Sequence, residues 1–136
     1  TGKLLIIYIP AQILGCLLGV MLANVFFEHN ILELSTKNRD GFHIFLSEII
    51  ATFGLIFIIF ATLKDGKITI AASVATYIMA GYWFTSSTSF ANPAVAIART
   101  FTDSFTGINY MNTPTYILAE FLGALIAVFL IKKLIK

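Results

Sequence analysis

The chain has 136 residues, of which 58% are hydrophobic and only 12% charged, and its net charge is +2. Soluble domains average about 45–50% apolar and about 25% charged residues, so this composition indicates a protein whose apolar surface is covered by lipid. The small net charge predicts no nucleic-acid partner. The single cysteine excludes an internal disulfide and a cysteine-based zinc site. The sequence begins with Thr1 and shows no cleavable signal before its first apolar run, so we expect it to be part of a longer protein.

Four apolar stretches are long enough to cross a bilayer, which takes about 20 residues in a helix. In chain order they are residues 4–27, 42–63, 68–84 and 115–131. In lipid such stretches form α-helices, because the backbone then satisfies its own hydrogen bonds. The sequence therefore predicts an all-α, multi-pass membrane protein whose direct partner is the lipid bilayer.

The basic residues predict how these spans are oriented. With four alternating spans, one side of the membrane holds Lys3, Lys64, Lys67, Lys132, Lys133 and Lys136. The other side holds Lys37, Arg39 and Arg99. Because an excess of basic residues marks the cytoplasmic side, we expect the C-terminus in the cytoplasm and the chain in the plasma (inner) membrane. The connection 29–41 and the one before residue 115 then face outward.

An internal repeat predicts how the spans are grouped. Residues 8–22 match residues 116–130 at eight of fifteen positions. Transporters and channels are often built from inverted repeats, so we interpret residues 42–136 as one complete repeat and residues 1–28 as the last helix of another. Small residues recur every fourth position in both copies, a spacing that lets helices pack closely in lipid. The predicted packing glycines are Gly15, Gly19 and Gly123.

The connection 85–105 carries the most informative motif. Asn92 is a favoured N-cap and Pro93 suits the first position of a helix. The helix predicted over residues 93–105 is too short to span a membrane and too apolar for a solvated loop. A re-entrant half-helix satisfies both conditions, because irregular backbone is tolerated at membrane depth where it lines a wet cavity.

Two motifs resemble the aquaporin, or major intrinsic protein, family. Asn92, Pro93 and Ala94 match the Asn-Pro-Ala motif at the head of its half-helices, and Glu48 with Thr52 matches a Glu-x-x-x-Thr motif. The resemblance runs from the third to the sixth span. It implies an inverted-repeat bundle, here with four spans and one half-helix, in a homotetramer with one pore per subunit. The N-terminal repeat with the other half-helix is missing, so this chain alone is not expected to form a complete pore.

The resemblance also implies a selectivity filter that is altered in this sequence. The family normally has arginine directly after Asn-Pro-Ala, where this chain has Val95. Arg99 lies one turn further on the same helical face, and it either rings the pore or forms a salt bridge with Asp103. Ala80 takes the place of a filter histidine, and Ser89 occupies the loop position. These residues predict a wide filter that passes neutral solutes larger than water.

The expected function is therefore passive passage of water or small neutral solutes, such as glycerol or undissociated metalloid acids. An alternative is a non-conducting membrane subunit that packs against a partner. Buried ionisable residues in spans are usually functional, and we expect Glu48, with Thr52, to support the re-entrant loop. The sequence offers neither a His-Glu metal pair nor a convincing Ser-His arrangement. We therefore expect no enzyme, no metal and no cofactor.

Overall fold

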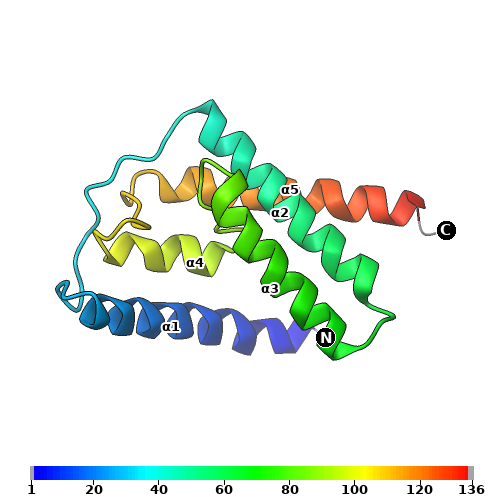
Figure 1. Ribbon diagram of the computed structural model, residues 1–136, viewed down its shortest axis with the longest axis horizontal. Coiled ribbons are helices and arrows are strands. Elements are labelled where there is room, and N and C mark those ends of the chain that lie inside the picture. Colours follow the sequence, from blue (N-terminus) through cyan, green and yellow to red (C-terminus); the bar gives the residue numbers. More distant parts are fainter. Residues whose placement is uncertain (1, 135–136) are drawn as a thin grey trace. The chain divides into compact units, whose positions relative to one another are not determined.

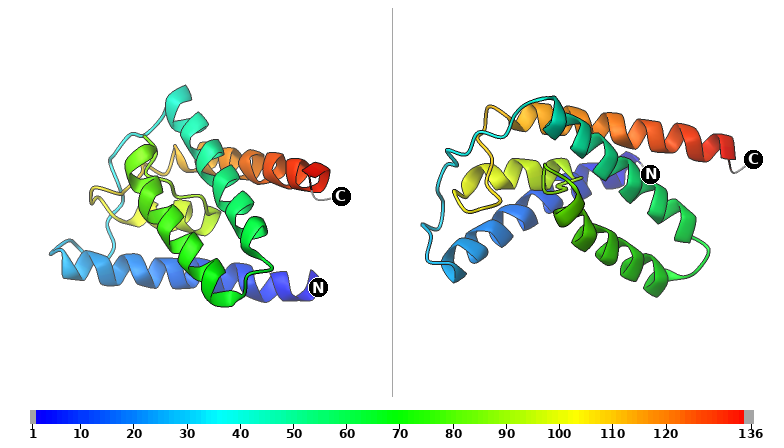
Figure 2. Two further views of the ribbon diagram at one scale, coloured as in Figure 1. Left: turned by 45° about the vertical axis from the view of Figure 1, so that its right-hand side comes forward. Right: turned by 45° about the horizontal axis from the view of Figure 1, so that its top comes forward.

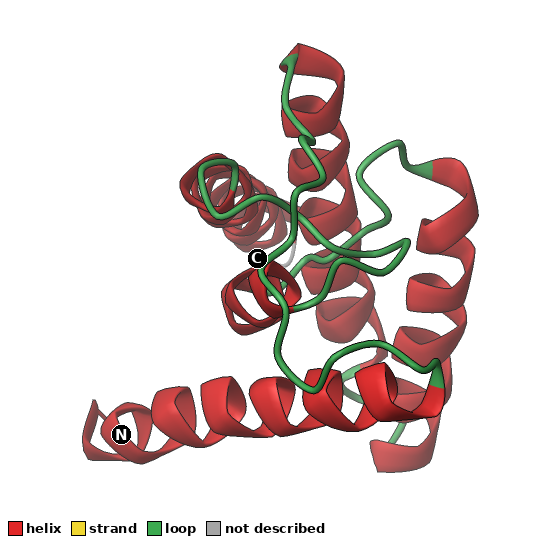
Figure 3. Ribbon diagram, turned by 90° about the vertical axis from the view of Figure 1, so that its left-hand side faces the viewer, coloured by secondary structure: helices red, strands yellow, loops and turns green. Residues whose placement is uncertain are grey.

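The computed structural model describes residues 2–134, and this part of the chain contains helices, turns and loops but no strand (Figure 3). Thr1, Ile135 and Lys136 lie outside the described residues, and with them the last lysine of the predicted cytoplasmic tail. The prediction of an all-α fold is confirmed. The elements are α1 (Gly2–Phe26), α2 (Phe42–Thr62), α3 (Lys67–Phe84), α4 (Pro93–Ala98), the 3₁₀ helix η1 (Arg99–Phe101) and α5 (Thr113–Leu134).

The chain forms two compact units, each described by itself. The first unit contains the chain up to Arg39 together with Asn92–Pro114. The second contains Asp40–Ala91 and the chain from Thr115 onward. One of the three points where the chain passes between the units lies between Ala91 and Asn92, so the half-helix and the loop that precedes it belong to different units.

In the first unit, α4 and its continuation η1 lie along α1 (Figures 1 and 2). The helical stretch starts at Pro93 and ends at Phe101, whereas the sequence predicts a helix over residues 93–105. It ends sooner because Thr102 adopts extended backbone angles, and the Thr102 hydroxyl donates a hydrogen bond to the side-chain oxygen of Asn24 on α1.

In the second unit, α2 and α3 form a helical hairpin (Figures 1 and 2). The connecting turn uses Gly66 at a φ of 90°, a conformation that glycine adopts without steric cost. The hydroxyl of Tyr77 on α3 donates a hydrogen bond to the carbonyl oxygen of Ala51 on α2 at 3.0 Å. Gly54 leaves the space for this tyrosine, because a Cβ at that position would clash with the phenol. The hairpin therefore depends on one small residue facing one large one.

Three of the four predicted spans form helices that meet the length and hydropathy of a membrane span, and the fourth span remains a prediction. Among the described residues, three helices are long and apolar enough to cross a membrane: Leu4–Phe26, Phe42–Thr62 and Thr113–Leu134. The stretch 68–84, predicted as a fourth, forms the 18-residue helix α3 but falls short in mean hydropathy. Lys67, which begins α3 and lies outside the predicted stretch, lowers that value most, and the hydroxyl residues lower it further. Thr69 and Thr76 donate hydrogen bonds to the carbonyl oxygens four residues earlier, which reduces the cost of burying their hydroxyls in lipid.

Large apolar side chains remain exposed along α1. Ile6 is 75% exposed, Leu18 65% and Phe26 71%. Soluble monomers rarely expose continuous apolar patches of this kind, so this face is suited to lipid or to further protein.

Candidate functional site

The half-helix begins with a complete N-terminal cap. The side-chain oxygen of Asn92 accepts a hydrogen bond from the backbone N–H of Ala94 at 2.9 Å, and Pro93 occupies the first helical turn. Proline lacks an N–H group, so no donor is left over at its position. Residues Asn92, Pro93 and Ala94 are thus arranged as their types predict for a helix start.

The loop before the half-helix is held by Glu48, which is fully buried on α2. One carboxylate oxygen accepts from the N–H of Phe90 and the other from the N–H of Ala91, both at 2.9 Å. The sequence predicts a loop-supporting role for Glu48; these two contacts are of the kind that such a role needs, and the role itself remains a prediction. Thr88, Ser89 and Ala91 have φ values of 66°, 50° and 49°, which non-glycine residues rarely adopt. Backbone in such regions persists where its surroundings constrain it, and Glu48 supplies that constraint.

Thr52 lies one turn after Glu48 and is also buried. A Cβ added at Gly123 of α5 would be 3.1 Å from the Thr52 Cβ and would collide with the carbonyl oxygen of Ile49. The Thr52 hydroxyl has no hydrogen-bond partner in the described part of the chain. The contact seen for Thr52 is therefore with α5, and its predicted support of the loop remains a prediction.

The predicted packing glycines fall into two groups. Gly123 marks the point where α5 crosses α2 at close range. A Cβ added at Gly15 or Gly19 would meet no atom within 4 Å, because both face open space on α1. Their packing role remains a prediction.

The predicted filter residues are distributed over both units. Ala80 is exposed near the end of α3, and Ser89 is buried with its hydroxyl 2.5 Å from where a Cβ of Gly81 would lie. Both belong to the second unit, whereas Val95 and Arg99 belong to the first. Val95 and Arg99 line the same pocket, as their i, i+4 spacing on one helical face predicts.

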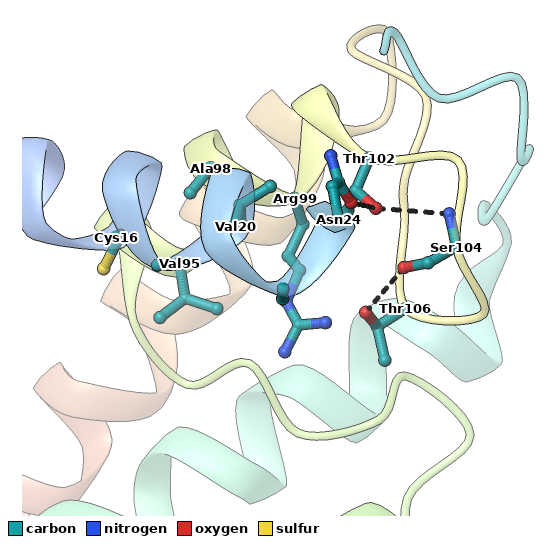
Figure 4. A pocket seen from close by; sticks show the side chains of 11 residues that line it. Cys16, Val20, Asn24, Val95, Ala98, Arg99, Thr102, Ser104 and Thr106 are labelled. Atoms are coloured by element: carbon teal, nitrogen blue, oxygen red, sulfur yellow. Dashed lines mark hydrogen bonds between the residues drawn. The ribbon is translucent and has the colours of Figure 1, made fainter. Parts of the chain in front are cut away.

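This pocket has a volume of about 240 Å³ and opens between α1 and the half-helix. The apolar part of its wall consists of Cys16, Gly19, Val20, Ala23, Val95 and Ala98. The polar part consists of Asn24, Arg99, Thr102, Ser104 and Thr106. Figure 4 shows the Arg99 guanidinium reaching into the space between Val95 and Thr106. The pocket therefore combines a small apolar wall with a cationic and hydroxyl-rich end.

Asn24 organises the polar end of the pocket and was not identified from the sequence. It is 2% exposed, and its amide group donates to the carbonyl oxygens of Ile31 and Phe101 at 3.2 and 3.1 Å. Its side-chain oxygen accepts from the hydroxyl of Thr102. The signal available in the sequence was an amide inside the apolar run 4–27, since polar residues within spans usually have a role.

The segment 30–39, here called the strap, closes over the loop that follows η1. The backbone N–H of Ser35 donates to the carbonyl oxygen of Thr100 at 2.9 Å. The Arg39 guanidinium donates to the carbonyl oxygen of Phe105 at 2.9 Å and lies 5.7 Å from the centre of its ring. The strap therefore holds the loop that supplies the polar end of the pocket.

Asp103 provides a further attachment for the strap. Its carboxylate accepts from the backbone N–H of Thr36 at 2.9 Å and from the hydroxyls of Thr36 and Ser35 at 3.2 Å. The backbone N–H of Thr36 is the main reason that the pKa of Asp103 lies below its ordinary value of 3.8, and the two hydroxyls and the charge of Lys37 add to it. The sequence offers a salt bridge with Asp103 as one of two possible roles for Arg99. In the structure, the contacts described for Asp103 are those with the strap.

We expect the variant Asp103→Asn to release the strap at neutral pH, because an amide oxygen accepts fewer and weaker hydrogen bonds than a carboxylate. A carboxyl whose pKa is lowered by folding stabilises the folded state above its unfolded pKa, here 3.8, and loses this effect as the pH falls through the lower folded value. The protection of the Thr36 amide against hydrogen–deuterium exchange, relative to its intrinsic exchange rate at the same pH, should therefore fall in the variant at pH 7, and in the wild type only below pH 3.8. Asp65→Asn, in the exposed turn between α2 and α3, is the control. Unchanged exchange in Asp103→Asn would contradict the assignment.

Comparison with known proteins agrees with these features. No family model matches the sequence, and no solved structure matches it. The chain is 43% identical over 129 residues to aquaglyceroporin AqpS of Rhizobium meliloti (strain 1021). The match covers 95% of this chain and 55% of that protein, so the chain spans about half the length of the curated relative. The match and the apolar helices show an integral, multi-pass membrane protein. The chain belongs to the aquaporin, or major intrinsic protein, family.

Proposed function

We propose that the chain is the C-terminal portion of a passive channel for water and small neutral solutes, such as glycerol or undissociated metalloid acids. The observation that carries this proposal is the capped half-helix at Asn92, together with the carboxylate of Glu48 that holds the strained loop in front of it. A helix N-terminus carries a partial positive charge, which opposes the passage of cations and orients water. The curated relative is an aquaglyceroporin, which supports the same reading. The protein acts as a channel, not as an enzyme.

The assembled pore includes parts outside this chain. We infer an N-terminal repeat with the second half-helix, and a homotetramer in which each subunit has its own pore. The six-to-three distribution of basic residues favours a cytoplasmic C-terminus in the plasma membrane. A reporter fused after Lys136 tests this orientation, and reporter activity only outside the cell would contradict it.

Solute size is set, in this proposal, by Val95 where the family has arginine, with Ala80 and Ser89 as the other filter residues. An aliphatic side chain leaves a wider opening than a guanidinium and removes a fixed positive charge. Exclusion of cations then depends mainly on the dipole of the half-helix, helped by Arg99 one turn further along.

The variant Val95→Arg should depress glycerol flux more than water flux. We expect a loss in glycerol flux of about tenfold or more, which corresponds to a barrier higher by about 1.4 kcal/mol, because the longer cationic side chain narrows the opening. Light scattering by proteoliposomes that carry the full-length protein measures both fluxes, under glycerol and sucrose gradients.

The matched control is Val95→Leu, which adds one methylene and no charge and should leave the ratio of glycerol to water flux near that of the wild type. Equal loss of both fluxes in Val95→Arg would indicate simple blockage. Absence of any flux in the wild type would favour the alternative of a non-conducting membrane subunit.

A further inference from the structure

The polar end of the pocket in the first unit lies one helical turn beyond Val95 and contains residues outside the Asn-Pro-Ala motif. A second pocket of about 450 Å³ shares five lining residues with the first and continues to Phe27, His29 and Phe105. The shared residues are Ala23, Asn24, Arg99, Ser104 and Thr106. Arg99, Ser104 and Thr106 therefore stand where the two cavities adjoin.

These polar groups are held in place before any solute arrives. Thr102 donates its hydroxyl proton to Asn24 on α1, and the Thr102 hydroxyl oxygen accepts from the backbone N–H of Ser104 at 3.3 Å. The hydroxyls of Ser104 and Thr106 lie 3.3 Å apart and share a hydrogen bond (Figure 4). Hydrogen bonds thus connect the buried amide of Asn24 to the mouth of the pocket. Polar groups fixed in this way lose little entropy when they bind a solute.

Arg99 is fixed at the backbone as well. Its N–H donates to the carbonyl oxygens of Ile97 and Val95, and its own carbonyl oxygen accepts from the N–H of Ile108 at 3.1 Å. The guanidinium reaches into the space between Val95 and Thr106 (Figure 4). A guanidinium offers only donors, whereas a hydroxyl can donate and accept. The site therefore presents the donors of a guanidinium, carried by a fixed backbone, together with two adaptable hydroxyls.

We propose that Arg99, Ser104 and Thr106 form a second solute-binding site, beyond the Val95 filter, for small neutral solutes with adjacent hydroxyl groups. The oxygens of such a solute accept hydrogen bonds from Arg99 and exchange hydrogen bonds with Ser104 and Thr106. Its C–H edge lies against the apolar wall formed by Val20 and Val95. The volume of about 240 Å³ equals that of about eight waters at about 30 Å³ each, enough for a solute with a few heavy atoms.

The site favours a neutral polyol over an anion for two reasons. Most of the named wall is apolar, so an anion would lose hydration that one guanidinium restores only in part. Asp103, in the loop that carries Ser104 and Thr106, adds a negative charge to this segment. The role of Asn24 is to position the loop, because its hydrogen bonds go to Ile31, Phe101 and Thr102.

The test rests on the proposed channel function and compares two solutes of the same length. Glycerol has three adjacent hydroxyls, whereas 1,3-propanediol lacks the middle one. Flux of both solutes and of water is measured by light scattering in proteoliposomes with the full-length protein. In the wild type, glycerol should be favoured over the diol. Arg99→Leu and the double variant Ser104→Ala/Thr106→Val should each reduce this preference about five- to tenfold, the range expected for one lost hydrogen bond.

Controls separate the possible outcomes. Thr76→Val removes a hydroxyl that bonds only within α3, and it should keep the wild-type preference. Water flux shows that each variant is folded, and if Arg99→Leu fails to reach the membrane, the Ser104/Thr106 pair tests the same site. If Arg99→Leu and the double variant both keep the wild-type preference for glycerol over the diol, the proposed second site is wrong. The proposed channel function is not contradicted by that result. Absence of all flux in the wild type overturns both.

Discussion

Replacing Glu48 with leucine is expected to destabilise the protein strongly and to abolish solute flux. The change leaves the N–H groups of Phe90 and Ala91 without acceptors in a buried place, at about 1–3 kcal/mol for each lost partner. These N–H groups belong to the segment with left-handed backbone angles directly before Asn92. Loss of Glu48 therefore removes the constraint on the loop that leads into the half-helix.

Glu48→Gln gives a graded comparison. Glutamine keeps the shape of the side chain but has only one acceptor oxygen, so one of the two N–H groups would face an amide nitrogen. We expect the order of thermal stability, measured in detergent by the loss of monodisperse protein, to be wild type, then Gln, then Leu.

The control for this series is Glu33→Gln, whose carboxylate bonds to Asn30 at an exposed position and whose change should stay within about 0.5 kcal/mol. If Glu48→Leu is as stable as the wild type, the carboxylate does not hold the loop.

Introducing a methyl group at Gly123 should also be costly. A Cβ there would collide with the carbonyl oxygen of Ile49 and lie 3.1 Å from the backbone nitrogen of Phe53, so α5 would have to move away from α2. Overpacking of this kind costs about 1–3 kcal/mol. In Gly123→Ala this loss outweighs the gain of about 1 kcal/mol in helix propensity, because backbone atoms cannot rotate aside as a side chain does.

Gly123→Val, with a larger side chain, should be less stable than Gly123→Ala. Thermal stability is measured in detergent by the loss of monodisperse protein. Leu125→Ala, on the same helix at a side chain that is 65% exposed, is the control and should have little effect. A Gly123→Ala protein with wild-type stability would show that the two helices do not depend on this close approach.

Much of the candidate site could be predicted because its signals are local. The side chain of Asn92 reaches its own helix two residues ahead, and Pro93 has the backbone angle that a helix start requires, so neighbouring residues alone place the half-helix. Glu48 was recognisable because a carboxylate in an apolar run requires donors, and a loop rich in backbone N–H groups supplies them. Residues 68–84 form a helix as predicted, and whether that helix spans the membrane remains a prediction, because Lys67 and the hydroxyl residues keep the mean hydropathy of α3 low.

The sequence by itself determined the helical class, the membrane character and the start of the half-helix, because apolar runs and helix caps act over a few neighbouring residues. Only the tertiary structure decided that Asn24 bonds to Phe101 and Thr102, more than seventy residues along the chain. It also decided that Asp103 is held by the strap. These contacts join segments that are distant in the chain, and their partners are common polar groups. A hydrogen bond between such groups depends on how the intervening chain folds back, which no local pattern of residues specifies.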